Sequence, residues 1–349
     1  MLYLFGAGRN GKRVKKICIE IGCEVEGFID NKLCGGYIDG IKICALSDLG
    51  NKNIFIIITV MDMEAIHEIC DQLQRYGFIK GKNYIVWREI EERIQRSNRD
   101  WKKYPNEKRK IIELYNELQS VYKKFVLPDM TIVNDIETIE LMFGLIGTGN
   151  AEAIYIRYYL NQTLQLKGDI CEFGIAQGAT SALLANEIRE IDKRLWLFDS
   201  FEGLSVPTSK DILKDDIFHY GSMEKYAYSM KCSMDEVCKR MKNIGINEDK
   251  ICIIPGFIEN TVKQKNVNEE LSQICFAYVD FDLYEPILTA LEFINERSEK
   301  GCVIIVDDYD FFSTGAKTAV DEFVSKYGEN YSLKIPVECA GHFAIIQRV

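Results

Sequence analysis

The chain has 349 residues, of which 47% are hydrophobic and 28% are charged, as in globular proteins of about two domains. Its formal net charge of −10 disfavours nucleic acid as a partner, and no apolar run approaches the ~20 residues of a membrane span. The first residues show no basic segment followed by a long apolar one, so a cytoplasmic location is expected.

Residues 1–90 alternate between strand-like and helix-like patterns, which predicts a small α/β domain with a parallel sheet. Strands are expected at 2–8, 24–30, 53–60 and 83–87, and helices over 14–21 and 63–76. A domain of about 90 residues lacks the second half of a dinucleotide fold, so we do not expect dehydrogenase activity from it.

The first turn of this domain, "LFGAGRNGKR", fits two nucleotide-binding patterns. As a G-x-G-x-x-G turn it uses Gly6, Gly8 and Gly11, and Asp30 ends the next strand at the spacing of that fingerprint. As a Walker A motif it has Arg13 in place of the Ser or Thr that holds Mg²⁺, so the first pattern is favoured. The domain resembles small Rossmann-like modules that precede catalytic domains in bacterial sugar- and polysaccharide-modifying enzymes. That resemblance implies either a nucleotide-sugar site or a purely structural module, and both interpretations stay open.

Residues 91–150 are predicted to form a helical connector to a second domain over 151–349. The stretch 91–125 is charged and is interrupted by Pro105, a pattern typical of a solvated connector. An oligomerisation arm would look similar, so a homo-oligomer also stays open. Two further helices are expected, around 135–146 and 151–165.

The second domain shows five strand-like runs, mostly separated by helical patterns, at 169–174, 194–200, 250–256, 274–282 and 302–308. After a helix at about 315–327, two more runs, 331–337 and 342–349, lie too close together for a crossover helix and must pair as a hairpin. This arrangement resembles the fold of S-adenosylmethionine-dependent methyltransferases, in which the last strand inserts antiparallel. The expected fold class is therefore α/β, with a class I methyltransferase sheet after a smaller Rossmann-like domain.

The twelve cysteines of the chain favour neither disulfides nor a zinc site, because no C-x-x-C spacing occurs. Four of them adjoin or lie within apolar strand-like runs: Cys171, Cys252, Cys275 and Cys302. Cysteines in this setting usually act as small core side chains. Only three histidines occur, and they are too scattered to suggest a transition-metal site.

A glycine-rich turn, "CEFGIAQGAT", follows the first strand of the second domain and opens a helix. Gly174 and Gly178 let a ligand approach the backbone closely, and the helix N-terminus offers free N–H donors. Ala176 takes the middle place of the G-x-G-x-x-G pattern, and the acidic Glu172 precedes it. Methyltransferases hold S-adenosylmethionine with an acidic strand end followed by such a turn, although a tight strand-to-helix turn also needs glycine.

Asp199 ends the next strand, where a carboxylate accepts both ribose hydroxyls in dinucleotide folds. This position strengthens the prediction of a nucleoside-containing cofactor. The alternative is that Asp199 only caps a turn or helix, together with Ser200.

Two later strand-like runs end in carboxylates: "YVDFDLYEP" carries Asp280 and Asp282, and "VIIVDDYD" carries Asp307, Asp308 and Asp310. A helical pattern lies between them, so the two strands are expected to run parallel and to end at the same edge of the sheet. Carboxylates without His or Cys suit Mg²⁺, Mn²⁺ or Ca²⁺. Such an ion lowers the pKa of a substrate hydroxyl, and a nearby Asp can take the proton. The alternative is that these acids merely cap turns or face solvent.

Six blocks occur in the order and spacing of the macrocin O-methyltransferase family, whose members methylate sugar hydroxyls on natural products: "CEFGIAQGAT", "LFDSFEGL", "IIPGFIENTV", "YVDFDLYEP", "VIIVDDYD" and "GAKTAVDEF". The resemblance covers about 150–349. It implies S-adenosylmethionine as methyl donor, a divalent metal that is usually Mg²⁺, and a sugar acceptor presented as a nucleotide-sugar, a glycan or a glycosylated metabolite. The "GIAQGAT" turn departs from the family in lacking a Trp-Arg pair and a second glycine.

The resemblance also implies roles for individual residues. Asp280, Asp307 and Asp308 would be the metal ligands, with Asp280 the candidate general base, whereas Asp282 and Asp310 are expected to be bystanders. The residues that would line the cofactor lie in two turns and at two strand ends: Glu172, Gly174, Gly178, Asp199, Ser200, Gly256 and Phe257.

The segment 205–235 is polar, aromatic and poorly periodic, and two interpretations of it stay open. A long insertion beside a cofactor site is often a lid, and His219, Tyr220 and Tyr226 would then contact an acceptor. An ordinary pair of surface helices is the alternative.

The predicted function is metal-dependent transfer of a methyl group from S-adenosylmethionine to a sugar hydroxyl of a small molecule or glycan. A catechol-type O-methyltransferase is one alternative, since it would use Mg²⁺ and carboxylates as well. A non-catalytic protein that binds a nucleotide-sugar at Gly6–Gly11 is another. The acidic residues argue against this second alternative, because a pure binding protein gains little from carboxylates that nothing neutralises.

Overall fold

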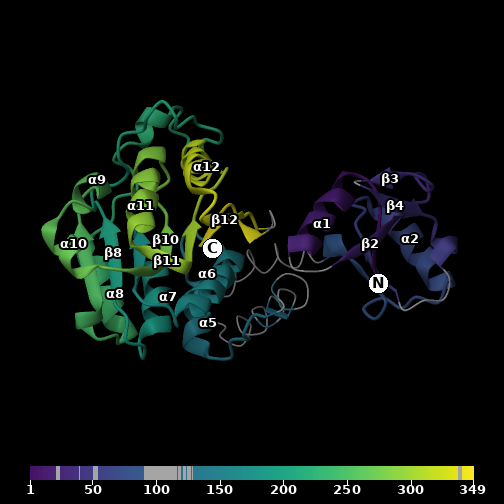
Figure 1. Cartoon of the computed structure of the whole chain (residues 1–349), viewed down its shortest axis with the longest axis horizontal. Helices are drawn as coiled ribbons and strands as arrows, with labels where there is room; N and C mark the ends of the chain where they lie inside the picture. The colour runs from purple at the N-terminus through teal and green to yellow at the C-terminus, as the bar shows by residue number, and fades with distance from the viewer. Residues whose placement is uncertain are drawn as a thin grey trace. The chain divides into compact units, whose positions relative to one another are not determined.

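The computed structural model describes residues 1–20, 24–38, 40–49, 54–89, 116, 119–120, 123, 127, 129–336 and 340–349. The chain divides into two units, Met1–Ile132 and Val133–Val349, both drawn in Figure 1. Nearly all of the charged stretch predicted at 91–125 lies outside the described residues. Within the part of the chain that is described, no helix has the length and apolar character needed to cross a bilayer.

The first unit is built on a six-stranded sheet in the order β3-β4-β2-β1-β5-β6. Its strands are β1 (Leu2–Phe5), β2 (Val25–Ile29), β3 (Tyr37–Ile38), β4 (Ile41–Cys44), β5 (Phe55–Ile58) and β6 (Tyr84–Val86). Within residues 1–86 of the described part, its helices are α1 (Arg9–Glu20), α2 (Met63–Arg75) and the 3₁₀ helix η1 (Leu46–Leu49). Neighbouring strands run parallel except for β3 and β4, which pair antiparallel.

The edge of this sheet corrects the sequence prediction, which had four strands, all parallel. The two strands that were missed, β3 and β4, are two and four residues long. Glycines at 35, 36 and 40 interrupt this stretch, so the sequence resembles a loop rather than a strand. The four predicted strands and both predicted helices are present, with shorter strand bounds than expected.

The second unit contains a seven-stranded sheet in the order β12-β13-β11-β10-β7-β8-β9. Its strands are β7 (Asp169–Phe173), β8 (Leu195–Asp199), β9 (Ile251–Pro255), β10 (Ile274–Val279), β11 (Ser298–Val306), β12 (Tyr331–Lys334) and β13 (Ala344–Arg348). β13 pairs antiparallel with both β11 and β12, and the other pairs are parallel. The predicted hairpin and the antiparallel insertion of the last strand are confirmed, and with them the methyltransferase-type fold.

Helices cover both faces of this sheet. They are α5 (Ile136–Phe143), α6 (Asn150–Thr163), α7 (Ala179–Ile188), α8 (Met234–Ile244), α9 (Ile258–Thr261), α10 (Lys265–Glu270), α11 (Tyr284–Arg297) and α12 (Gly315–Tyr327), with the 3₁₀ helices η3 (Met223–Tyr226) and η4 (Glu248–Lys250). α11 and α12 pack together over one face, whereas α6 packs against β10 and β11 from the other (Figure 1). Every residue of β10 is buried, as expected for a central parallel strand covered on both sides.

The register of the central strands decides which residues meet at the carboxyl edge. Val279 of β10 pairs with Phe173 of β7 and with Val306 of β11. The Asp280 N–H donates to the Phe173 carbonyl at 2.7 Å, and the Asp307 N–H donates to the Val279 carbonyl at 2.9 Å. The acidic residues that follow β10 and β11 therefore lie beside the glycine turn that follows β7.

Candidate active site

The turn after β7 requires glycine at two positions for reasons of backbone geometry. Gly174 has φ +89°, and a Cβ added to it would overlap the carbonyl oxygen of Asp280. Gly178 caps α7 in the left-handed region, with φ +71°, and Val237 packs against the side where a Cβ would stand. The glycine at 174 thus allows the turn to pass directly over the end of β10, which brings the two halves of the predicted site together.

Glu172 lies one residue before the end of β7 and is 1% exposed. Its Oε2 atom is buried without a hydrogen-bond partner, although Glu172 lines the cavity at this edge of the sheet. Burial raises the pKa of Glu172 to about 8. A buried polar atom without a partner is uncommon, and here it fits a polar group of a ligand held in the cavity.

Asp199, at the end of β8, braces the same turn. Its Oδ2 atom accepts hydrogen bonds from the Ile175 N–H at 2.8 Å and the Ala176 N–H at 3.2 Å. Its Oδ1 atom accepts from the Phe201 N–H at 2.7 Å. The Ser200 hydroxyl donates to the Gly203 carbonyl at 2.8 Å. The capping role considered for Asp199 and Ser200 is therefore present, and acceptor capacity remains on Oδ1 for a ribose hydroxyl.

Gly256 and Phe257 follow β9 and complete this side of the site. The Gly256 N–H donates to the Asp199 carbonyl at 2.8 Å, and Gly256 has φ +128°. Phe257 precedes the first residue of α9 and lines the cavity. Its ring supplies an apolar wall of the kind that stacks on a purine base.

Three carboxylates converge at the ends of β10 and β11. One oxygen from each of Asp280, Asp282 and Asp308 lies within 4.8 Å of the other two. Asp282 and Asp308 have φ of +62° and +56°, so left-handed turns aim both side chains at this group. Asp282, which was expected to be a bystander, lies in this group. Asp310 lies apart from it, exposed and ion-paired with Lys214 at 2.5 Å.

Asp307 also lines the cavity but is not one of these three carboxylates, and its own carboxylate bonds with a buried tyrosine. Its Oδ2 atom accepts a hydrogen bond from the buried Tyr278 hydroxyl at 2.5 Å, and its Oδ1 atom accepts from the Asp308 N–H at 2.8 Å. Glu152, on α6, is 2% exposed and lies 3.3 Å from the Tyr278 hydroxyl. The sequence analysis missed Tyr278 and Glu152. A hydroxyl in the otherwise apolar β10 was a signal for Tyr278, whereas Glu152 does not stand out among the several polar residues of α6.

The electrostatics of the carboxylates fit a cation. Burial, followed by repulsion from Asp307 and Asp308, raises the pKa of Asp280 well above its usual range. Burial and then Asp280 raise the pKa of Asp282 to about 7. An all-oxygen group of this kind is the donor set that Mg²⁺, Mn²⁺ and Ca²⁺ prefer, and a bound dication would stabilise the ionised carboxylates.

A single cavity of about 560 Å³ joins the two halves of the site. Its wall includes Glu172, Gly174 and Asp199 on one side and the acidic residues on the other. Apolar residues complete it: Ile146, Ile217, Phe218, Met230, Phe257 and Phe311. This volume falls in the range of small-molecule and cofactor sites.

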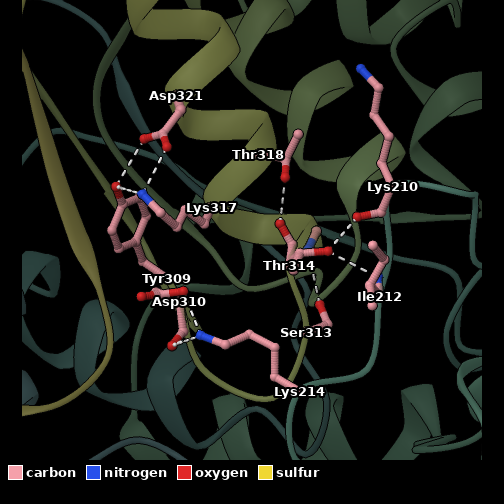
Figure 2. A network of polar contacts seen from close by, with 11 residues as sticks. Lys210, Ile212, Lys214, Tyr309, Asp310, Ser313, Thr314, Lys317, Thr318 and Asp321 are labelled. Carbon is pink, nitrogen blue, oxygen red and sulfur yellow. Dashed lines mark hydrogen bonds and ion pairs between the residues drawn. The ribbon is translucent and has the colours of Figure 1, made fainter.

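The segment 205–235 contains the short 3₁₀ helix η3 and only the first two residues of α8, so it is not the pair of surface helices that was one of its two interpretations. Figure 2 shows how its first part is tied to the β11–α12 region. The Thr314 hydroxyl donates to the Lys210 carbonyl at 2.6 Å, and the Ile212 N–H donates to that hydroxyl oxygen at 2.9 Å. The lid interpretation stays a prediction.

The three aromatic side chains considered as acceptor contacts have different positions. Tyr226 is fully buried, stacks on Phe312 with ring centroids 5.5 Å apart, and donates to Asp216 at 2.9 Å. It therefore belongs to the core under the segment. His219 and Tyr220 are exposed and are not among the residues that line the cavity.

The glycine turn of the first unit is largely explained by packing. A Cβ on Gly11 would overlap the Gly6 carbonyl oxygen, and a Cβ on Gly6, whose φ is +117°, would lie 2.9 Å from the Thr59 hydroxyl. Asp30 accepts from the Ala7 N–H at 2.9 Å through Oδ2. Gly8 is different, because nothing lies within 4 Å of its added Cβ.

Comparison with known proteins matches the second unit of the chain to a family. A family model described as macrocin-O-methyltransferase (TylF) matches residues 147–345. A curated Streptomyces olivaceus protein, 8-demethyl-8-(2,3-dimethoxy-alpha-L-rhamnosyl)-tetracenomycin-C 4'-O-methyltransferase, is 24% identical over 164 residues, or 46% of this chain. The match spans 59% of that relative, less than two thirds of its length.

Among solved structures, the O-methyltransferase NovP is 21% identical, with a TM-score of 0.49 over 58% of this chain and 81% of its own. The calicheamicin methyltransferase CalS11 is 19% identical, with a TM-score of 0.46 over 73% of this chain and 91% of its own. The family match extends over more than half of the residues, so the chain belongs to the macrocin O-methyltransferase family.

Proposed function

We propose that this protein transfers a methyl group from S-adenosylmethionine to a sugar hydroxyl, assisted by a divalent cation. The observation that carries the proposal is the shared cavity: the glycine turn with Glu172 and Asp199 opens into the same space as Asp280, Asp282 and Asp308. A donor and an acceptor bound in that space would lie side by side, as methyl transfer requires.

The residues of the chain have separable tasks in this proposal. Glu172, Asp199 and Phe257 would hold the nucleoside and amino-acid parts of the cofactor, which supplies an electrophilic methyl group. Asp280 accepts the proton of the acceptor hydroxyl. The apolar walls exclude water from the reacting atoms.

The ligands of the cation are a second part of the proposal. Asp280 and Asp308 belong both to the set implied by the family and to the set that converges in space. The third ligand is Asp307 by family resemblance and Asp282 by geometry. A cation held there would lower the pKa of the acceptor hydroxyl.

The acceptor would be a sugar in a nucleotide-sugar, a polysaccharide or a glycosylated metabolite. The name of the curated relative describes methylation of a rhamnosyl group on tetracenomycin C, and CalS11 is described as a TDP-rhamnose 3'-O-methyltransferase. In the first unit, the open position at Gly8 supports a role in recognising the nucleotide part of an activated sugar. We place this reaction in the cytoplasm.

Calorimetric titration with S-adenosylmethionine, with and without Mg²⁺, tests the proposal together with methylation assays on sugar and catechol acceptors. We expect micromolar cofactor binding, and methylation of a sugar that depends on Mg²⁺ and is lost in Asp308→Asn. Methylation of catechols alone would support the catechol-type alternative. Tight nucleotide-sugar binding without methylation of any acceptor would support a non-catalytic protein.

A further inference from the structure

We propose that Tyr278 is a positioning residue of this site: its hydroxyl holds Asp307 turned inward, and Asp307 in turn keeps Asp308 aimed at the carboxylate group. The inference rests on the proposed function in one respect, that the carboxylate group binds a cation. It assigns work to a side chain that would contact neither the cofactor nor the acceptor.

The first observation is the placement of the Tyr278 hydroxyl. Tyr278 is fully buried in β10, two residues before Asp280, and the rest of this strand is apolar. Its hydroxyl lies 2.5 Å from Asp307 Oδ2 and 3.3 Å from Glu152 Oε1. A hydroxyl has one proton to donate, and the shorter contact places that proton on the bond to Asp307.

The second observation is the bond that Asp307 makes with its other oxygen. Oδ1 accepts from the Asp308 N–H at 2.8 Å, while the Asp307 N–H is itself anchored on the Val279 carbonyl at 2.9 Å. Asp308 has φ +56°, a region that residues other than glycine rarely adopt. The hydrogen bond from its N–H therefore supports a backbone conformation that is unfavourable by itself, and that conformation directs the Asp308 side chain to Asp280 and Asp282.

The third observation is the support behind the tyrosine. Glu152 reaches the hydroxyl from α6, and the Thr148 hydroxyl lies 3.4 Å from the same oxygen. Buried polar groups cost free energy unless they are paired, so a phenylalanine among apolar partners would pack β10 at lower cost. A polar cluster kept beneath the acidic residues is consistent with a role in holding them in place.

Removing the Tyr278 hydroxyl should weaken first its contact with Asp307 and then the contact of Asp307 with Asp308. Asp307 loses the bond that orients Oδ2, its Oδ1 then holds the Asp308 N–H less well, and the carboxylate of Asp308 leaves the group more often. Loss of a hydrogen-bonding partner behind a metal ligand typically weakens metal binding about 10- to 100-fold.

The test compares Tyr278→Phe with Tyr331→Phe in the full chain. Tyr331 is a matched control because it is 3% exposed, and its hydroxyl bonds with Ser298 and Asn295, both at 3.0 Å. Both variants lose one buried hydroxyl, but only Tyr278 touches Asp307. We expect Mn²⁺, followed by electron paramagnetic resonance, to bind about 10- to 100-fold more weakly to Tyr278→Phe and unchanged to Tyr331→Phe.

A second measurement does not depend on any metal. Hydrogen exchange of the Asp308 amide should be at least about 10-fold faster in Tyr278→Phe than in wild type, and unchanged in Tyr331→Phe. Should Tyr278→Phe fail to fold, Tyr278→Met carries the same test, because it also lacks the hydroxyl and its flexible side chain can fill the space. Asp307→Ala tests the second contact, because it removes the acceptor of the Asp308 amide.

The outcomes separate the inference from the proposed function. Unchanged Asp308 exchange in Tyr278→Phe or Asp307→Ala overturns the inference whether or not a cation binds. Equal loss of Mn²⁺ affinity in Tyr278→Phe and Tyr331→Phe overturns it as well, since the effect would then be general destabilisation. Wild-type protein that binds no Mn²⁺ would refute the proposed cation site, and amide exchange alone would then decide the role of Tyr278.

Discussion

The sheets of the two units share the same arrangement of three neighbouring strands, but they carry different side chains at the ends of these strands. In the first unit the Gly6 N–H donates to Ile29 at 2.8 Å, and the Thr59 N–H donates to Phe5 at 2.9 Å. In the second unit the Gly174 N–H donates to Phe198 at 2.9 Å, and the Asp280 N–H donates to Phe173 at 2.7 Å. An aspartate at the next strand end accepts from the glycine turn in both units, through Asp30 and Asp199.

The residues at equivalent places show how the units diverge. Thr59, 1% exposed, donates its hydroxyl to the Phe5 and Gly6 carbonyls, so the strand end of the first unit is satisfied internally. Asp280 stands at the equivalent place in the second unit, among other carboxylates. Leu4 of the first unit, fully buried, corresponds to Glu172 of the second. The backbone at the carboxyl edge of the sheet is therefore the same in both units. The side chains at two positions differ: Thr59 and Leu4 in the first unit correspond to the carboxylates Asp280 and Glu172 in the second.

The largest effect is expected at the glycine turns. Gly174→Ala should destabilise the second unit by more than about 4 kcal/mol, because its Cβ would overlap a backbone oxygen and its φ is +89°. Gly8→Ala in the first unit should change stability by less than about 0.5 kcal/mol, since its Cβ would meet nothing within 4 Å. Urea unfolding checks both variants. A nucleotide that binds wild type but not Gly8→Ala would add a ligand site to the first unit.

Replacing the carboxylate that distinguishes the second unit should nearly abolish turnover. We expect Asp280→Asn to lower kcat by roughly 10²- to 10⁴-fold, because the amide cannot accept the hydroxyl proton. Asp310→Asn is the matched control, since Asp310 is an exposed acid on the same edge and pairs with Lys214. Steady-state methylation kinetics give the answer, and equal activity of the two variants would contradict the assignment.

Glu172 should make the stability of the second unit depend on pH. The equivalent residue of the first unit, Leu4, does not titrate and cannot have this effect. The folded protein keeps the Glu172 proton up to a pKa of about 8, whereas the unfolded chain loses it near 4.5. Between these values the unfolded state binds fewer protons, so stability falls as pH rises. The difference in free energy of unfolding between Glu172→Gln and wild type should shift by about 3 kcal/mol in favour of the variant from pH 5 to pH 8. Urea unfolding at several pH values measures it, and a pH-independent difference would show that Glu172 is ionised when folded.

The smallest effect is expected at Thr59, whose hydroxyl hydrogen-bonds to backbone carbonyls within the first unit. Thr59→Val removes a hydroxyl that bonds with two carbonyl groups, which should cost about 1 kcal/mol. The methylation rate should stay unchanged, because Thr59 belongs to the first unit. A loss of methylation with the unit still folded would mean that this unit takes part in the reaction.

Local chemistry made much of the fold predictable. Apolar runs and helical patterns located the strands of the second sheet and most of its helices, and glycine at 174 and 178 marked a turn that other residues do not readily form. The β3–β4 pair was missed because Gly35, Gly36 and Gly40 interrupt its apolar pattern. Strands, helices and glycine turns depend on residues that are close in the sequence, so they can be predicted from the sequence when their pattern is uninterrupted.

The composition of the acidic group depended on distant contacts. Sequence placed five aspartates at two strand ends but selected Asp307 and passed over Asp282. In the structure, Tyr278 turns Asp307 inward from 29 residues away, and left-handed turns direct Asp282 and Asp308 to Asp280. The direction of a side chain beyond a strand end is set by turn geometry and by partners from other elements, which strand periodicity does not encode. The sequence by itself determined that carboxylates gather beside a cofactor-type turn; tertiary structure decided which of them face one another.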